Sequence, residues 1–270
     1  MKKILFMIAL ALTMVSCSQN KEDSKSLVIY YSQTGATKQV AHEIAQLLNA
    51  DTLRIDVTQP YDGTYDETIA RCLKEKEANI VPELKNQDID VAKYDTIFIG
   101  YPIWFGTYAP PIAALVNEVD FTGKKIVPFC TFGSGGLEAS VKDLKNVLPE
   151  SEICNGYGVR NARIAKAPAE VELFLIENGY MAGEMEKLAD YSEQQAVTLE
   201  EIDIFNIACG NYQFPLGTPV TVGKRATSAG VDYRYTVNST SPDSVVTEST
   251  IYVTVDNAPD AKPEFIKVVR

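Results

Sequence analysis

The sequence predicts an α/β protein in which a doubly wound, five-stranded parallel sheet is followed by a smaller α+β domain with an antiparallel sheet. Between residues 27 and 177, short apolar runs alternate with stretches whose apolar residues recur at helical spacing. From residue 198 onward, one helical stretch precedes four β-patterned runs. A chain of 270 residues that is 46% hydrophobic has room for one or two domains, and this composition excludes a mainly disordered or collagen-like chain.

The strands of the parallel sheet are expected from apolar, β-rich runs, because strands buried on both faces need not alternate apolar and polar residues. The runs 27–31 and 96–100 are continuously apolar, whereas 52–57 is more polar and is assigned by its β-rich pattern. The five expected strands are 27–31, 52–57, 96–100, 125–131 and 153–159.

Helical spacing marks the segments between these strands. Val40 and Ile44 lie one turn apart after the turn at 32–35, and Pro110 suits the first turn of a short helix. Asn178-Gly179 is a typical helix stop. The expected helices are one that carries Val40, Ile44 and Leu47/Leu48, and then 65–78, 110–119, 137–148 and 169–177.

The C-terminal segment begins with Thr198-Leu-Glu-Glu201, a capping-box pattern that predicts a helix to about Tyr212. Polar and apolar residues then alternate around Tyr233 and Tyr235, which we expect in the core of a half-buried antiparallel sheet. The expected strands are 220–227, 231–238, 249–255 and 264–269. We therefore divide the folded part of the chain into domains 26–187 and 188–270, with the connector at 180–197.

Charge and histidine content exclude two classes of function. The formal net charge is −11, from 25 Lys and Arg against 36 Asp and Glu, whereas a duplex nucleic-acid binder needs a basic surplus to neutralise phosphates. The single histidine, His42, rules out a multi-histidine metal site within one chain, and we expect no metal. His42 itself is expected on the surface or in packing, so any chemistry must come from a bound cofactor.

Residues 1–16 resemble a signal peptide: two lysines precede an apolar run, 4–15, that is short for a membrane span. Ser16-Cys17 follows it and resembles the lipobox of bacterial lipoproteins, which implies cleavage before Cys17 and lipidation of its thiol. An ordinary secretory signal is the alternative. Residues 17–25 are polar and charged, as in a flexible tether. We therefore expect a protein of the cell envelope of a Gram-negative bacterium, periplasmic or surface-exposed, that meets the membrane only through its anchor.

Four further cysteines would face an oxidising compartment after export. They are widely spaced, without a CxxC pair, and we expect them mostly as small buried apolar residues. One disulfide is an open alternative, and four cysteines permit three pairings between which the sequence does not choose. They are Cys72, Cys130, Cys154 and Cys209.

The loop after the first strand has the composition of a phosphate cradle. In an open parallel sheet, ligands bind beyond the carboxyl ends of the strands. Here Gly35 permits a tight turn, the following helix start offers free N–H donors, and three hydroxyls can donate. The loop has neither the lysine of a nucleoside-triphosphate loop nor the GxGxxG of a dinucleotide site, which leaves a monophosphate. A helix cap without a ligand is the alternative. The loop is Ser32-Gln33-Thr34-Gly35-Ala36-Thr37.

Two further loops at the same edge carry aromatic residues and glycines. Residues 100–107 hold the only tryptophan, Trp104, beside Phe105, and an aromatic pair on a loop suits a flat apolar ligand. Residues 131–136 hold three glycines, which allow close backbone contact. Alternatively, Trp104 covers the edge of the core and the glycines form a flexible loop.

Together the three loops resemble the flavodoxin family. Residues 32–37 match its [ST]-x-T-G-x-T phosphate loop, and 100–104 and 131–136 look like its two flavin-contacting loops. The resemblance covers about residues 26–180 and implies a sheet of order 2-1-3-4-5 and bound FMN. Phe132 precedes the glycines, whereas many flavodoxins place their second aromatic residue later in the loop. The resemblance therefore does not identify the residue that covers the outer face of the flavin.

The family resemblance also implies which residues contact FMN. Ser32, Thr34, Gly35 and Thr37 would hold the phosphate within the loop that includes Gln33 and Ala36. Trp104 and Phe132 would flank the isoalloxazine, and no catalytic side chain is expected. The backbone contacts would come from Pro102, Ile103, Trp104, Phe105 and Gly106 in the second loop and from Thr131, Phe132, Gly133 and Gly136 in the third.

The leading hypothesis is a lipid-anchored, FMN-binding redox protein that transfers electrons or reduces a small acceptor such as a quinone. The acidic chain should disfavour the anionic reduced flavin and lower its potential. One alternative is an NAD(P)H-dependent FMN oxidoreductase, so the choice between enzyme and carrier stays open. Another is a non-redox surface protein in which the flavodoxin-like domain is a scaffold and the C-terminal domain binds the partner.

Overall fold

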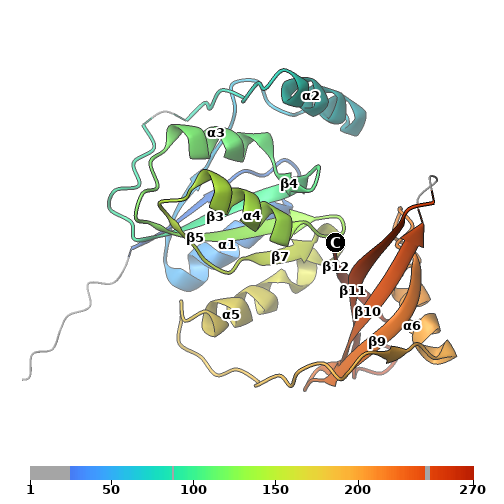
Figure 1. The fold of residues 1–270 in the computed structure, drawn as a ribbon. Coiled ribbons are helices and arrows are strands. Elements are labelled where there is room, and N and C mark those ends of the chain that lie inside the picture. Colours follow the sequence, from blue (N-terminus) through green and yellow to red (C-terminus); the bar gives the residue numbers. More distant parts are fainter. Residues whose placement is uncertain (1–24, 87, 241–243) are drawn as a thin grey trace, which may run out of the picture.

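The computed structural model describes residues 25–86, 88–240 and 244–270. Within these ranges the chain forms an α/β unit and, after it, a separate antiparallel sheet with one helix (Figure 1). The expected signal peptide and Cys17 lie outside the described residues. In the part of the chain that is described, no helix is long and apolar enough to cross a bilayer.

The α/β unit is built on a seven-stranded sheet in which every pairing except that of a short hairpin is parallel. Its order is β2-β1-β3-β5-β6, with β7 beside β5 and β4 beside β3, which confirms the expected 2-1-3-4-5 order of the main strands. The strands are β1 (Ser26–Tyr30), β2 (Asp51–Arg54), β3 (Thr96–Trp104), β4 (Thr107–Tyr108), β5 (Lys125–Phe132), β6 (Glu152–Ile153) and β7 (Tyr157–Arg160).

One expected strand, 153–159, is divided into β6 and β7. β6 pairs with the start of β5 and β7 with its end, and the break lies opposite Pro128. Proline has no N–H to donate to a neighbouring strand, so the ladder cannot continue through this level. Gly156 lies in the break, where an added Cβ would approach the carbonyl oxygen of Pro128 to 2.8 Å.

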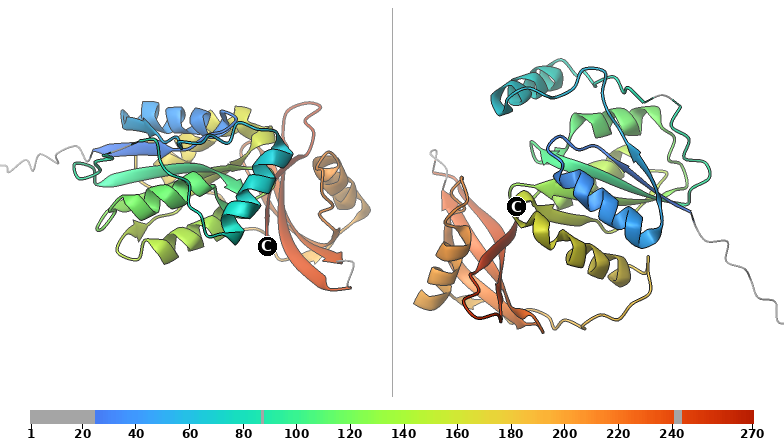
Figure 2. Two further views of the ribbon diagram at one scale, coloured as in Figure 1. Left: turned by 90° about the horizontal axis from the view of Figure 1, so that it is seen from above. Right: turned by 180° about the vertical axis from the view of Figure 1, so that it is seen from behind.

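Helices cover both faces of this sheet, as the edge-on view shows (Figure 2). Val28 and Tyr30 point to the face covered by α1 and α5, whereas Leu27 and Ile29 point to the face covered by α3 and α4. α2 lies apart from this face and joins the same core through Cys72. Strand residues alternate between faces, so one short apolar strand serves both cores. The helices are α1 (Ala36–Leu48), α2 (Tyr65–Glu77), α3 (Pro110–Glu118), α4 (Leu137–Val147) and α5 (Ala167–Glu177), the last preceded by the 3₁₀ helix η1 (Asn161–Lys166).

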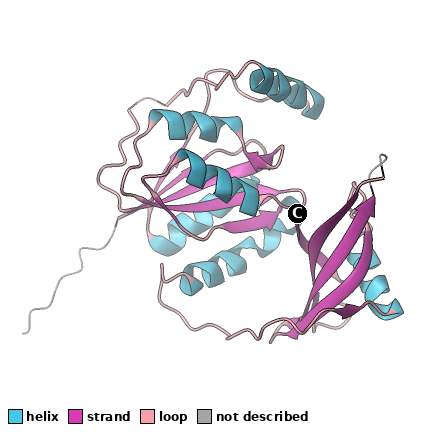
Figure 3. Cartoon of the chain, in the orientation of Figure 1, coloured by secondary structure: helices cyan, strands magenta, loops and turns pink. Residues whose placement is uncertain are grey.

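The C-terminal unit is a five-stranded antiparallel sheet of order β12-β11-β10-β9-β8 with α6 on one face (Figure 3). Phe205 of α6 packs edge to face on Tyr235, with 5.3 Å between the ring centroids. Tyr235 is fully buried as expected, whereas Tyr233 is half-buried. The elements are β8 (Gln195–Ala196), α6 (Leu199–Cys209), β9 (Thr218–Ala226), β10 (Gly230–Thr240), β11 (Val246–Asp256) and β12 (Glu264–Val269).

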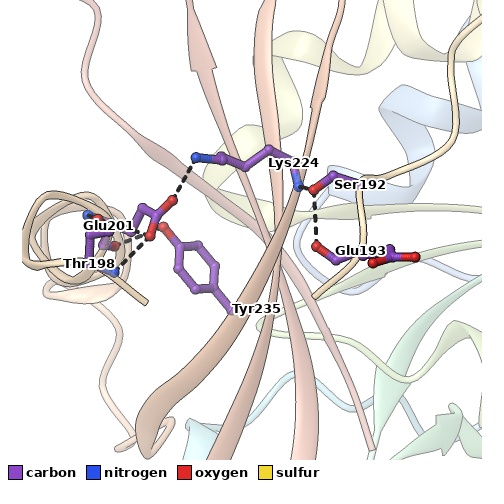
Figure 4. A network of polar contacts seen from close by, with 6 residues as sticks. All are labelled: Ser192, Glu193, Thr198, Glu201, Lys224 and Tyr235. Carbon is purple, nitrogen blue, oxygen red and sulfur yellow. Dashed lines mark hydrogen bonds and ion pairs between the residues drawn. The ribbon is translucent and has the colours of Figure 1, made fainter. Parts of the chain in front are cut away.

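The start of α6 confirms the expected capping box (Figure 4). The Thr198 backbone N–H and hydroxyl donate to Glu201 Oε2 at 2.8 and 2.9 Å, and Lys224 Nζ lies 2.7 Å from Glu201 Oε1. Burial opposes ionisation of Glu201, but the bonds from Lys224 and Thr198 outweigh it and hold the carboxyl pKa below its ordinary value. The Tyr235 hydroxyl donates to the Glu201 carbonyl at 2.8 Å, so the helix start is fixed to the sheet.

The four described cysteines are free thiols. Two are buried, as expected of small apolar residues, and two are half-buried. The buried pair are Cys72 and Cys130, and the half-buried pair are Cys154 and Cys209.

Candidate functional site

The loops after β1, β3 and β5 meet at the carboxyl edge of the parallel sheet. The strand register places Gly100 beside Tyr30 on one side and Phe129 on the other, so the three strands end next to each other. Thr37 and Thr131 join the first and third loops by a buried hydroxyl–hydroxyl bond of 2.9 Å. The edge therefore brings together the three segments in which the sequence predicts the site.

The first loop, 32–37, is organised by its own serine. Ser32 Oγ accepts the N–H groups of Gly35 and Lys38, each at 3.2 Å, and Gly35 adopts a φ of +98° at the start of α1. Ala36 and Thr37 lie in the first turn of α1, where backbone N–H groups have no acceptor within the helix. These two groups and the exposed Thr34 hydroxyl can donate to a ligand at the loop.

The hydroxyls expected at a phosphate have different environments. Thr34 is exposed, whereas Ser32 and Thr37 are buried and bonded within the protein. The sequence spacing puts all three in one loop but does not determine where each side chain points. The expectation that all three contact a phosphate stays a prediction.

Two cationic side chains lie at this loop, one of them paired with a carboxylate. The first turn of α1 has no acidic residue, and the exposed Lys38 lies within it. Arg54 Nη2 donates to the Ser32 carbonyl at 3.5 Å while its Nε lies 3.1 Å from Asp56. Together with the partial positive charge of the helix end, these cations favour an anion at the loop in an otherwise acidic protein.

The second loop is a tight hairpin between β3 and β4. Trp104 pairs with Thr107, and the two residues between them, Phe105 and Gly106, have φ angles of +50° and +82°. Positive φ at both central positions is the geometry of a type I′ turn, which glycine adopts freely and phenylalanine only at a cost. Phe105 is 54% exposed at the hairpin tip.

Trp104 belongs to an aromatic trio with Tyr31 and Tyr61. Its ring centroid lies 5.9 Å from that of Tyr31 and 5.2 Å from that of Tyr61, both edge to face. Gln33 Nε2 of the first loop donates to the Tyr61 carbonyl at 2.7 Å, so the trio is joined to the first loop. Sequence reasoning missed Tyr61, because the turn that contains it gives no sign of packing against a tryptophan.

The tyrosines of the trio are held neutral. Burial raises the pKa of Tyr31 to about 12. Burial also raises the pKa of Tyr61, whose hydroxyl donates to Glu75 at 2.6 Å. Arg71 stacks 3.8 Å above the Tyr61 ring and lies 2.7 Å from Glu75. These contacts fix one wall of the site before any ligand enters.

The third loop, 131–136, combines a buried aromatic with open glycines. Phe132 is 3% exposed and packs in the core of the sheet, at the base of a cavity of about 350 Å³. This cavity lies between the second and third loops. The other residues that line it are Ile103, Gly106, Gly133, Ser134, Gly135, Gly136, Glu138, Ala139, Val268, Val269 and Arg270.

The glycines leave backbone of all three loops exposed at this edge. A Cβ added at Gly35, Gly106 or Gly133 would meet no atom within 4 Å among the described residues, so each loop has open space beside its backbone. An anion would meet the start of α1, and a flat aromatic group would meet the loops beside Trp104. FMN combines a phosphate with a planar ring, so the residues present fit it.

Other parts of the molecule do not converge on this edge. His42 is exposed on α1, as expected from the sequence, with its ring 6.3 Å from that of Tyr30. A second cavity, of about 600 Å³, lies at the opposite end of the strands beside Leu27 and Asp51. Among the described residues, no cluster of three His, Cys, Asp or Glu side chains could hold a metal ion.

The fold and the three loops define an α/β protein in which the loop predicted to bind a phosphate lies beside an aromatic wall. The sequence profile of the flavodoxin family matches residues 25–171, which is more than half of the chain. The protein belongs to the flavodoxin family, and this membership supports FMN as its cofactor. The chain is also 28% identical over 146 residues to the flavodoxin-like domain-containing protein BilS of Clostridioides difficile strain CD3, a match that covers 53% of this chain and 68% of the relative.

Two solved structures from Bacteroides species resemble the first unit. A candidate flavoprotein from Bacteroides eggerthii has a TM-score of 0.52 and 26% identity, and one from Bacteroides uniformis has a TM-score of 0.50 and 27% identity. The matches cover 98% of each of those chains but only 58% and 55% of this one. Nearly all of each relative thus corresponds to the α/β unit, and the C-terminal unit is additional to it.

Proposed function

We propose that this protein binds FMN at the three converging loops and transfers electrons through it to a redox partner or a small acceptor. The observation that supports this most directly is the convergence of the three loops at one edge of the sheet, where a buried hydroxyl–hydroxyl bond of 2.9 Å joins Thr37 to Thr131. When bound, FMN supplies one- and two-electron transfer that no side chain provides.

In this proposal the first loop binds the phosphate. The open N–H groups of Ala36 and Thr37 and the Thr34 hydroxyl donate to its oxygens, while Ser32 holds the loop in shape through Gly35 and Lys38. Lys38 and the end of α1 contribute favourable charge.

The second and third loops enclose the ring. Trp104, supported by Tyr31 and Tyr61, provides the aromatic wall, and the backbone of 131–136 approaches the ring edge. Phe105 is exposed at the hairpin tip in a strained conformation, a position that suits contact with a partner protein or a small flat acceptor such as a quinone.

We further propose that the protein is a lipoprotein anchored at Cys17 in the cell envelope of a Gram-negative bacterium, periplasmic or surface-exposed. The support is the short apolar run 4–15 followed by Ser16-Cys17. Metabolic labelling with a fatty-acid analogue tests this, with Cys17→Ala as the control. Equal labelling of both forms would contradict the anchor.

A visible spectrum tests the cofactor assignment. A soluble form of residues 21–270 is mixed with FMN and freed of unbound flavin, and the proposal expects a retained flavin spectrum and quenched Trp104 fluorescence. Absence of both would overturn the redox function. NADH or NADPH oxidation, measured with and without a quinone, then separates an oxidoreductase from an electron carrier that needs a protein donor.

A further inference from the structure

The C-terminal unit lies directly against the third loop. Strand β12 is the edge strand of its sheet, and the backbone N–H of Val268 on β12 donates to the Ser134 carbonyl at 2.8 Å. A Cβ added at Gly135 would overlap the carbonyl oxygen of Val268. The two backbones are thus in close contact, and a residue with any side chain at position 135 would force them apart.

Arg160, at the end of β7, connects the same two segments. Its Nε donates to the Gly133 carbonyl at 2.8 Å, and its Nη1 donates to the Phe265 carbonyl on β12 at 2.9 Å. The guanidinium also lies 4.1 Å above the Phe265 ring and 5.5 Å from that of Tyr212. One cation therefore fixes a carbonyl of the glycine-rich loop and a carbonyl of the C-terminal sheet, and charged donors make the stronger hydrogen bonds.

The cavity between the second and third loops has walls from both units. Ile103 and Gly106 line it from the hairpin, and Val268, Val269 and Arg270 line it from the C-terminal unit. Lys267 and Glu138 lie 2.6 Å apart and join β12 to the start of α4 next to this cavity.

We propose that Arg160 and strand β12 position the third loop, and that the docked C-terminal unit is thereby part of the cofactor site. This inference rests on the proposed function. A loop with three glycines loses much conformational entropy when it is ordered. Docking orders the loop in advance, so a ligand that uses the loop binds more tightly to the docked form. By linkage, the ligand must stabilise docking by the same factor.

Two glycines of the loop provide a matched test in the full chain. Gly135→Ala adds a methyl group that overlaps Val268 O, whereas Gly133→Ala adds the same group where no described atom lies within 4 Å. Neither glycine has a positive φ, so the backbone accepts alanine at both. Hydrogen exchange of the FMN-free protein is measured over 131–136 and 264–269, with Gly133→Ala as the control for docking alone.

We expect faster exchange over both segments in Gly135→Ala and unchanged exchange over 264–269 in Gly133→Ala. FMN is then titrated into the wild type, Gly135→Ala and Arg160→Gln. Loss of the hydrogen bonds from the Arg160 guanidinium should weaken FMN binding about 10- to 100-fold. Arg160→Gln also keeps the test decisive if Gly135→Ala does not fold.

The outcomes separate this inference from the proposed function. If the wild type binds FMN and both variants bind it within twofold of the wild type, the positioning role is overturned and the redox function stands. If hydrogen exchange over 131–136 is unchanged in both Gly135→Ala and Arg160→Gln, the inference is also overturned. If the wild type retains no FMN, the redox function and its coupling to docking fail, and exchange alone decides whether the C-terminal unit orders the loop.

Discussion

Trp104 is held between Tyr31 and Tyr61 at centroid distances of 5.9 and 5.2 Å, so its ring is already oriented before a flat ligand arrives. Trp104→Ala should weaken FMN binding by about 1–3 kcal/mol, the range for loss of one aromatic stack. Flavin titration followed by fluorescence measures this. Phe214→Ala, which truncates a 56% exposed aromatic of the C-terminal unit, is the control. Unchanged affinity in Trp104→Ala would remove the ring from the site.

Tyr31 predicts a loss of stability at alkaline pH. Its folded pKa of about 12 exceeds the ordinary 10, so between these values the hydroxyl ionises in the unfolded chain but not in the folded one. The neutral Tyr31 hydroxyl therefore contributes its full share of the free energy of unfolding below pH 10, and this share is lost as the pH rises towards 12. After solvent screening it amounts to about 1–2 kcal/mol.

Urea unfolding between pH 8 and 11.5 tests this. Tyr31→Phe should lose less stability over that range than the wild type, whereas Tyr65→Phe, at a side chain 76% exposed, should follow the wild type. Parallel curves for all three proteins would contradict the assignment.

At the residue scale, the sequence predicted which loops form the site, but it did not predict the direction in which each side chain points. The motif 32–37 predicts the phosphate loop, yet the Thr37 hydroxyl bonds to Thr131, 94 positions away. Tyr61 and Arg160 were missed for the same reason. Their partners are distant in sequence, and no local spacing encodes such contacts.

At the element scale, period and turn signals predicted most helices and strands. The elements that differ do so because neighbouring chain segments decide them. Pro128 divides the expected strand 153–159, and the pairing of Trp104 with Thr107 extends β3 beyond residue 100 into a hairpin. The helix expected to reach Tyr212 ends at Cys209. The chain turns there, and the Tyr212 ring packs on the Phe265 ring with 5.4 Å between their centroids.

The capping box of α6 gives the element-scale prediction. Glu201→Gln removes the charge that Lys224 and Thr198 stabilise and should destabilise the C-terminal unit by about 1–3 kcal/mol. Because the pKa of Glu201 lies below its ordinary 4.5, its contribution is present above pH 4.5 and is lost as the pH falls through the folded value.

The equivalent box of α2 supplies the control. Glu67→Gln changes an exposed carboxylate with the same hydrogen-bond pattern and should cost less. Chemical unfolding of the three proteins at pH 7 and pH 3.5 checks both statements. The difference between Glu201→Gln and the wild type should shrink at pH 3.5. A constant difference would show that the carboxylate charge does not contribute.

At the scale of the whole molecule, two separately recognisable units are in direct contact at the third loop. The sequence predicted both units, because each has its own hydrophobic pattern and core. It did not predict their contact, since that contact combines backbone groups, a glycine and ion pairs between residues distant in sequence, none of which has a periodic signature. An edge strand such as β12 offers unpaired backbone groups, and here the Val268 N–H and the Phe265 carbonyl are bonded within the molecule.

Arg163 provides the prediction that tests this union independently of any cofactor. Its side chain is 12% exposed and joins Glu170 of α5 at 2.8 Å to Glu264 of β12 at 3.1 Å, whereas Lys166 and Asp256 form a cross-unit pair that is 49% and 41% exposed. Solvent screening leaves such an exposed pair worth about 0–1 kcal/mol, while loss of a buried arginine's charged hydrogen bonds costs about 1.5–3 kcal/mol each.

Arg163→Met should therefore speed hydrogen exchange over 264–269 at least about tenfold and speed proteolytic cleavage within the exposed segment 181–194. Lys166→Met should leave both measurements close to the wild type, and Glu264→Gln, which affects only the cross-unit half of the Arg163 contacts, should fall between them. Salt at 1 M should change both measurements little in the wild type, because solvent ions screen the contacts of the 12% exposed Arg163 less than those of the exposed Lys166–Asp256 pair. Equal effects of the two methionine variants would mean that Arg163 does not hold the C-terminal unit against the α/β unit.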